Sequence, residues 1–306
     1  MQAKNLPARA NIEHYKKQAK NLLSRVVSGE SEAIQRIRRL HPRLGTLSEP
    51  EIRDGSKLAD AQLVIAREHG HESWPAFTRE IHAAGKPTTS SERIPANGVY
   101  LLAKSSMPSE AVGLVLLLHT RSGGRLIPPS TYLMEALNRA SIGVISVDLL
   151  TVEESVRDVE TDELKHDLRL LGRRIAQVAD WLNGSSEFGG LSLGYMGSDT
   201  GAAAAAYSAA EYPEAVQALV FSAGRPDLAG PWLWRIKAPT LFVAGEKATV
   251  GRAFNHSAMR ALSPQVTSQF EIISGAGERF EDDDALKQCA RLSCDWFRQH
   301  LATQSA

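Results

Sequence analysis

The stretch LSLGYMGSDTGAAAAAYSAA, residues 191–210, decides the fold of the larger part of this 306-residue chain. Its first letters, LSLGYM, are typical of a buried β-strand, and its alanine-rich second half is typical of a helix. Gly197 and Gly201 stand two residues before and two residues after Asp199. A tight turn from strand to helix needs small residues at these two positions, because the two backbones approach closely there. The spacing therefore predicts that Asp199 occupies the apex of a strand, turn and helix connection.

Ser198 is the alternative apex residue, and its hydroxyl is the more familiar nucleophile. With Ser198 at the apex, the flanking positions become Met196 and Thr200, which carry side chains where the turn requires glycine. We therefore favour Asp199 on steric grounds.

The rest of the chain beyond residue 98 alternates between two patterns. Runs typical of strands occur at residues 99–103, 112–119, 142–148, 191–196, 218–222, 240–244 and 269–273. Helical patterns occur near residues 129–140, 162–183, 200–211, 250–262 and 284–301. Apolar strands that alternate with helices predict an α/β fold, a doubly wound and mainly parallel sheet covered on both faces. In such a sheet, functional residues are expected at the carboxyl ends of the strands.

The first 85 residues contain helical patterns and no strand pattern. Asn11 is a candidate cap for the first of four runs, at residues 12–26, 33–40, 57–70 and 73–85. The segment 86–98 is rich in Pro, Ser, Thr and Gly and is expected to be a linker. The predicted organisation is an all-α domain at residues 1–85, this linker, and an α/β domain at residues 99–306.

Charge is distributed unevenly although the chain carries 35 Lys and Arg against 35 Asp and Glu. Residues 1–86 carry 15 basic and 10 acidic side chains, and residues 87–306 carry 20 and 25. A basic helical module suits docking on an acidic neighbour. We expect a protein partner here and no nucleic acid, because aromatic interleaving and a nucleic-acid-binding motif are both lacking.

Other partners are not expected from the sequence. The longest apolar runs, such as VGLVLLL at residues 112–118, are far shorter than the about 20 residues of a membrane span, and the start MQAKNLPARAN has no apolar stretch behind it. Cys289 and Cys294 lie five apart in a helical pattern, which fits neither a disulfide nor a metal site. We therefore expect a cytoplasmic protein without membrane contact, metal or cofactor, and the oligomeric state stays open.

The segments LPARANIEHYKKQAKNLL and LADAQLVIAREHGHESWPAFTREI give the first 80 residues a family resemblance. They resemble a small helical module found ahead of varied bacterial domains, including ankyrin arrays. This resemblance implies no chemistry, and we expect it to mark a docking surface for a partner.

A second resemblance is carried by the segments VGLVLLLHT, SVDLLTVEE, LGYMGSDTGAAAA, FSAGRPDLAG, APTLFVAGE, ISGAGERFEDDDAL and DWFRQHL. Through them, residues 97–301 resemble the dienelactone-hydrolase-like branch of the α/β-hydrolase fold. In that family the nucleophile, a Ser or Cys, stands at the apex of the turn from strand to helix, where this chain has Asp199. The family's catalytic aspartate falls at Lys247 and its histidine at Glu278, so all three triad positions differ in chemical type.

The resemblance also implies which residues face a ligand. The loop after the first central strand, 119–125, carries candidate anion-binding side chains, and Thr120 replaces the usual glycine there. Candidate substrate-binding residues are His119, Arg121, Arg125, Ser198, Thr200 and Arg225. Arg225 suits either an acidic substrate group or the bracing of its own loop.

Two functions and one structural role remain open for this site. The first is a protein with an altered triad that binds a small molecule or partner without serine-type hydrolysis. The second is an enzyme that uses Asp199 as a carboxylate nucleophile or acid/base, assisted by Glu278, as the haloalkane dehalogenase and epoxide hydrolase relatives use an aspartate. Alternatively, Asp199, Lys247 and Glu278 form a charge cluster that only holds the loops.

Overall fold

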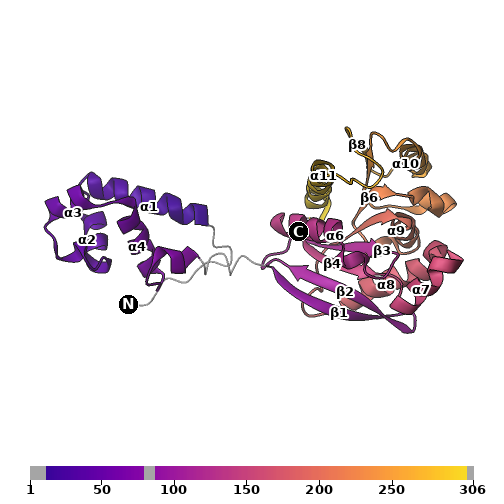
Figure 1. The fold of residues 1–306 in the computed structure, drawn as a ribbon, viewed down its shortest axis with the longest axis horizontal. Helices are drawn as coiled ribbons and strands as arrows, with labels where there is room; N and C mark the ends of the chain where they lie inside the picture. The colour runs from indigo at the N-terminus through magenta and orange to yellow at the C-terminus, as the bar shows by residue number, and fades with distance from the viewer. Residues whose placement is uncertain (1–11, 79–86, 302–306) are drawn as a thin grey trace. The chain divides into compact units, whose positions relative to one another are not determined.

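The computed structural model describes residues 12–78 and 87–301. The chain divides into two compact units between Lys86 and Pro87 (Figure 1).

The first unit is helical. Its helices are α1 (Ile12–Val27), α2 (Ser31–Leu40), α3 (Glu49–Gly55) and α4 (Leu58–Glu68), with a short 3-10 segment η1 (Leu44–Thr46). Residues 74–78 are also helical, whereas Asn11 and residues 79–85 of the fourth expected helix lie outside the described residues. Helix α3 was not expected from periodicity, and it begins where the Glu51 carboxylate accepts the Ser48 amide at 2.9 Å.

The second unit is built on one eight-stranded sheet. The strands are β1 (Thr88–Ala96), β2 (Val99–Met107), β3 (Leu114–His119), β4 (Gly143–Asp148), β5 (Leu193–Asp199), β6 (Ala218–Gly224), β7 (Thr240–Gly245) and β8 (Ser268–Ile273). Their order is β1-β2-β4-β3-β5-β6-β7-β8, antiparallel up to β4 and parallel from there on. This is the doubly wound, mainly parallel arrangement predicted from the strand and helix alternation.

The described part of the expected linker, residues 87–98, is mostly a β-strand. Strand β1 occupies most of the segment and pairs with β2 in an antiparallel hairpin, with Ala96 opposite Val99. The turn between them is Asn97-Gly98, and both residues have positive φ, at 51° and 79°. Asn-Gly favours this tight hairpin turn, and Pro95 is tolerated because β1 is an edge strand.

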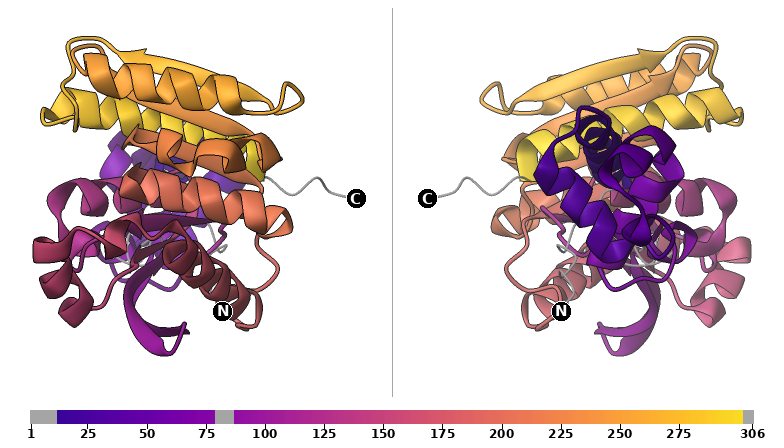
Figure 2. Two further views of the ribbon diagram at one scale, coloured as in Figure 1. Left: turned by 90° about the vertical axis from the view of Figure 1, so that its right-hand side faces the viewer. Right: turned by 90° about the vertical axis from the view of Figure 1, so that its left-hand side faces the viewer.

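Helices cover both faces of the sheet (Figures 1 and 2). They are α6 (Pro128–Arg139), α7 (Val152–Thr161), α8 (Leu168–Asn183), α9 (Thr200–Glu211), α10 (Thr249–Ala261) and α11 (Asp283–Leu301), with short 3-10 segments η2 (Gly124–Leu126), η3 (Leu164–His166), η4 (Pro213–Ala215) and η5 (Pro226–Arg235). In β3, Leu114, Leu116 and Leu118 join the apolar core that contains residues of α8, α9 and α10, while Val115 and Leu117 join the core under α6 and α11. Alternate side chains point to opposite faces of a strand, so both faces of β3 are buried.

Helix α7 was not expected from the sequence. Its valines are exposed and do not form the buried apolar face by which a helix is recognised. Within the residues that the structure describes, no helix combines the length and the apolar character needed to cross a membrane.

Candidate functional site

A cavity of about 670 Å³ opens at the carboxyl edge of the parallel strands. Its wall contains His119 from the end of β3, Asp199 from β5, Ala223 from β6 and Gly245 from β7. Parallel strands of this fold place ligand sites at that edge. The cavity is therefore the candidate site of the α/β unit.

Asp199 stands at the apex of the turn between β5 and α9. Its φ of 50° and ψ of −134° lie outside the regions that side chains normally adopt. A Cβ on Gly197 would lie 2.5 Å from the carbonyl oxygen of Gly201, and one on Gly201 would lie 2.6 Å from that of Leu118. The two glycines are thus required by close backbone approach, and they hold the Asp199 carboxylate, whose side chain is 53% exposed, in the cavity.

The charged partner of Asp199 is Arg121. The Arg121 Nη2 atom lies 3.7 Å from Asp199 Oδ2, and both side chains are more than half exposed, so the pair is weak. Thr200 is the first residue of α9, and its amide is therefore among those without a partner inside the helix. The Asp199 carboxylate therefore lies at the amino end of α9, where the helix dipole favours negative charge.

Thr120 and Thr200 connect the β3 loop to this turn. Their hydroxyl oxygens lie 2.7 Å apart, and both residues are buried. The Thr200 side chain is thereby engaged away from the cavity lining, whereas Ser198 is exposed and lines the cavity. The threonine pair therefore ties the loop after β3 to the turn at Asp199.

His119 is half-buried, and its Nε2 atom lies 2.9 Å from Ser146 Oγ. Burial lowers the pKa of His119 to about 4; the nearby Asp148 carboxylate opposes this shift and the Arg125 charge adds to it. The imidazole is therefore neutral at pH 7 and accepts a proton poorly.

Arg125 binds Asp148 rather than facing the cavity. Its guanidinium forms an ion pair with the buried Asp148 carboxylate, which also accepts the Gly123 amide at 2.7 Å and the Arg125 amide at 3.1 Å. Arg125 lies outside the cavity lining, and it shapes the 119–125 loop.

The structure separates two positions that the resemblance placed together. Glu278 is exposed and lines the cavity, whereas Lys247 is exposed outside that lining, with its amide donating to the Ala276 carbonyl at 2.9 Å. Across residues 12–78 and 87–301, no ion pair joins Asp199, Lys247 and Glu278. The charge cluster considered from the sequence is not formed.

Several cavity residues gave no signal in the sequence. Phe254 and Asn255 line the cavity from α10, and Ala223 and Phe280 line it with φ values of 50° and 53°. Positive φ is costly for such residues, which marks the wall as locally strained. The Asn255 amide group donates to the Gly224 carbonyl at 3.0 Å and so ties α10 to the end of β6. The helical pattern of residues 250–262 and the segments FSAGRPDLAG and ISGAGERFEDDDAL covered this region without singling out these side chains.

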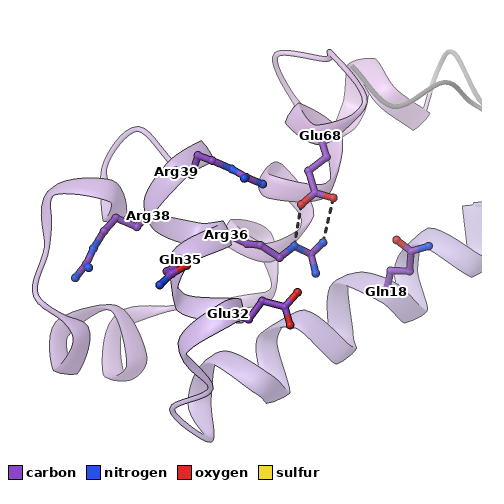
Figure 3. Close-up of a pocket in the computed structure, with 7 residues that line it drawn as sticks. All are labelled: Gln18, Glu32, Gln35, Arg36, Arg38, Arg39 and Glu68. Atoms are coloured by element: carbon purple, nitrogen blue, oxygen red, sulfur yellow. Dashed lines mark hydrogen bonds and ion pairs between the residues drawn. The ribbon is translucent and has the colours of Figure 1, made fainter. Parts of the chain in front are cut away.

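A second hollow, of about 720 Å³, lies on the helical unit (Figure 3). The Arg36 guanidinium binds the Glu68 carboxylate there at 2.8 and 3.0 Å, as Figure 3 shows. Glu32 is bound by Arg25 at 2.8 Å. Arg39 also lines this hollow, and it makes no ion pair within the described parts of the chain, so the hollow carries a net positive charge.

Comparison with known proteins supplies relatives for the chain, although no family model matches it. Proteins of two Mycobacterium tuberculosis strains, both named "putative phosphoribosyl transferase", are 32% identical over 251 residues. The match covers 81% of this chain, but the chain spans only 55% of the length of these relatives.

Solved structures match the α/β unit over nearly their whole length. A dienelactone hydrolase from Anabaena variabilis is 36% identical with a TM-score of 0.67, and the match covers 71% of this chain and 99% of that one. A dienelactone hydrolase-like promiscuous phosphotriesterase from metagenomic libraries is 15% identical with a TM-score of 0.58 and the same coverages. Est1E from Butyrivibrio proteoclasticus, 14% identical with a TM-score of 0.54, covers 68% of this chain and 98% of its own. The last two support the fold alone. The identity to the Anabaena protein, together with the sheet order and the strand, turn and helix at Asp199, shows that this chain belongs to the dienelactone-hydrolase-like family of α/β hydrolases.

Proposed function

We propose that the α/β unit binds a small molecule in the cavity at Asp199 without serine-type hydrolysis. The observation that carries this proposal is the carboxylate at the apex of the turn, where a serine mechanism needs a hydroxyl. Ser198 is displaced from the apex by one residue. The imidazole in the cavity lining, His119, is held by Ser146 and has a pKa of about 4, so it is a poor general base at pH 7.

The wall of the cavity supports a binding role. The lining contains apolar side chains such as Leu133, Met196 and Phe254 together with a few charged ones, among them Arg121 and Glu278. A concave, largely apolar site with a few polar groups suits a small organic molecule with a polar substituent.

A second function is favoured by the state of Asp199 itself. Its carboxylate is more than half exposed in the cavity, and Lys247 does not neutralise it. In this alternative an Asp199 oxygen attacks an electrophilic carbon, and the bond to the leaving group breaks, its electron pair going to that group. The alkyl ester formed is then hydrolysed by water, with Glu278 as the candidate base.

Intact-mass spectrometry distinguishes these functions. The native chain, Asp199→Asn and Ser198→Ala are incubated with 4-nitrophenyl acetate, a lactone, styrene oxide and 1-bromobutane. We expect no covalent adduct on any of the three and no ester hydrolysis above buffer, because the apex of the turn holds Asp199 and His119 is a poor base for a neighbouring hydroxyl. Thermal melting of each sample shows that the proteins are folded.

Covalent adducts in this experiment would identify one of two other mechanisms. An adduct on the native chain that Asp199→Asn alone removes establishes the carboxylate nucleophile. An adduct or esterase activity that Ser198→Ala alone removes establishes serine chemistry and contradicts both functions proposed here.

We also propose that the helical unit docks a protein partner through the positively charged hollow on α2. The sequence resemblance and the net charge of this unit support the proposal, as does Arg39, which is exposed in the hollow. The partner surface would be acidic.

A fluorescein-labelled hexaglutamate peptide tests this surface by fluorescence anisotropy on the full chain. At low ionic strength, Arg39→Glu is expected to weaken binding by roughly tenfold, because it reverses a charge at the hollow. Arg43→Glu makes the same change in net charge outside the hollow and is expected to have little effect. Equal losses in both variants, or no binding by the native chain, would contradict the proposal.

A further inference from the structure

Arg225 is a rigid, planar group in the wall of the cavity. It follows β6, and its Nε and Nη2 atoms donate to the two carboxylate oxygens of Asp227 at 2.9 and 2.8 Å. Its guanidinium carbon lies over the Phe254 ring, 3.7 Å from the ring centre, which is a close cation–π contact. The two-point pair with Asp227 and the ring beneath it fix both the position and the plane of the guanidinium.

This arrangement decides what Arg225 offers to a ligand. Asp227 compensates its charge and raises its pKa further, and the edge that faces Asp227 is occupied. Phe254 covers one flat face. The Arg225 side chain is nevertheless 35% exposed and lines the cavity, so the part of the guanidinium that Asp227 and Phe254 do not cover is available for contact with a ligand.

We infer that the stack of Arg225 on Phe254 is a subsite for a flat, π-bonded ring of the ligand. A guanidinium plane stacks on aromatic rings through cation–π and dispersion contacts, whereas it offers a saturated ring only apolar contact. The inference rests on the proposed function, since it names the class of molecule that the cavity binds.

The location of the subsite links it to Asp199. The Arg225 amide donates to the Asp199 carbonyl oxygen at 2.9 Å, so the residue that forms the subsite is attached to the apex of the turn. The Asp199 charge also acts on the Arg225 guanidinium and contributes to its raised pKa, so we expect a ring on Arg225 to carry its substituents toward the Asp199 carboxylate. Arg225 is assigned to ring recognition, and not to pairing with an anion.

Two neutral amides of similar size test ring recognition on the full chain. Benzamide carries a flat ring and cyclohexanecarboxamide a saturated one, and neither has a charge, so electrostatic attraction to the arginines does not distinguish them. Dissociation constants are measured by ligand-observed NMR titration. The native chain is expected to prefer benzamide by about 2- to 30-fold, the range of a cation–π contact.

Two variants test whether Arg225 and Phe254 cause the preference for benzamide. Arg225→Lys keeps the positive charge and removes the plane, and Phe254→Leu keeps an apolar side chain and removes the ring beneath; each is expected to bring the ratio of the two dissociation constants near one. Arg279→Lys is the matched control, because Arg279 lines the same cavity but lies over no aromatic ring of the described residues, and it is expected to keep the native ratio. Thermal melting verifies folding, and either variant suffices if the other does not fold.

A native chain that binds both amides equally, or neither of them, would overturn the inference. It would also be overturned by a preference that survives in Arg225→Lys and Phe254→Leu. These results are separable from a failure of the proposed function, which appears as a covalent adduct or ester hydrolysis.

Discussion

Gly201→Ala is expected to destabilise the α/β unit by about 3 kcal/mol, at the upper end of the cost of overpacking a close contact. The added methyl group would lie 2.6 Å from the Leu118 carbonyl oxygen, a distance that Cβ atoms do not tolerate. That oxygen belongs to the backbone of β3, so relief requires a shift of either α9 or the central strand. Urea denaturation of the full chain, followed by circular dichroism, measures the loss.

Gly251→Ala is the matched control for this substitution. Gly251 is the third residue of α10 as Gly201 is the second of α9, but its added methyl group would meet only the Ala248 side chain, at 3.7 Å. Alanine is the better helix former, so this variant is expected to keep or slightly raise the stability. If the two substitutions have the same effect, the tight contact between the turn and β3 is not what requires glycine at position 201.

The strands and helices of the α/β unit were largely predictable because the sheet is buried on both faces. Continuous apolar runs such as residues 114–118 are typical of strands that are buried on both faces. Strand β1 was not predicted from the sequence, because it is an edge strand with polar residues and Pro95, and these features are also typical of a linker. The Asn97-Gly98 turn was the available signal, and it indicates a hairpin only when the flanking residues are accepted as strands.

The site was predictable to a smaller extent. Glycine spacing located the strained apex at Asp199, since two tight backbone contacts dictate that spacing. Position in the chain did not reveal that Lys247 lies outside the cavity lining or that Arg125 binds Asp148. Side-chain direction depends on loop conformation, which no local pattern in the sequence encodes.

Arg174 supports α7, which adjoins the loop at the cavity. The Arg174 side chain is 2% exposed and donates to both carboxylate oxygens of Glu154, at 2.7 and 2.6 Å, and to the Leu149 carbonyl at 2.7 Å. Glu154 also accepts the Thr151 amide at 2.9 Å and so caps α7. The next residue, Ser155, accepts the Ser122 amide of the cavity loop at 2.8 Å.

Arg174→Ala is expected to cost roughly 3–5 kcal/mol of stability, because it leaves the Glu154 charge and the Leu149 carbonyl without their buried partner. Arg173→Ala provides the control on the same helix, since Arg173 is exposed, and its effect is expected within about 0.5 kcal/mol. Urea denaturation of both variants makes the comparison. Similar effects at the two positions would show that Arg174 contributes no more than a surface residue.

The pH dependence of stability gives a second test of the Arg174–Glu154 pair. The hydrogen bonds from Arg174 hold the pKa of Glu154 below its ordinary value, although partial burial opposes the shift. A lowered pKa in the folded state means that the carboxylate stabilises the fold above the unfolded pKa, about 4.3, and that this stability is lost as the pH falls through the folded pKa. The stability difference between the native chain and Glu154→Gln is therefore expected to be full at pH 7 and to shrink below about pH 4. A difference that does not change with pH would mean that the charge of Glu154 is not what Arg174 stabilises, and that α7 is held by its neutral contacts alone.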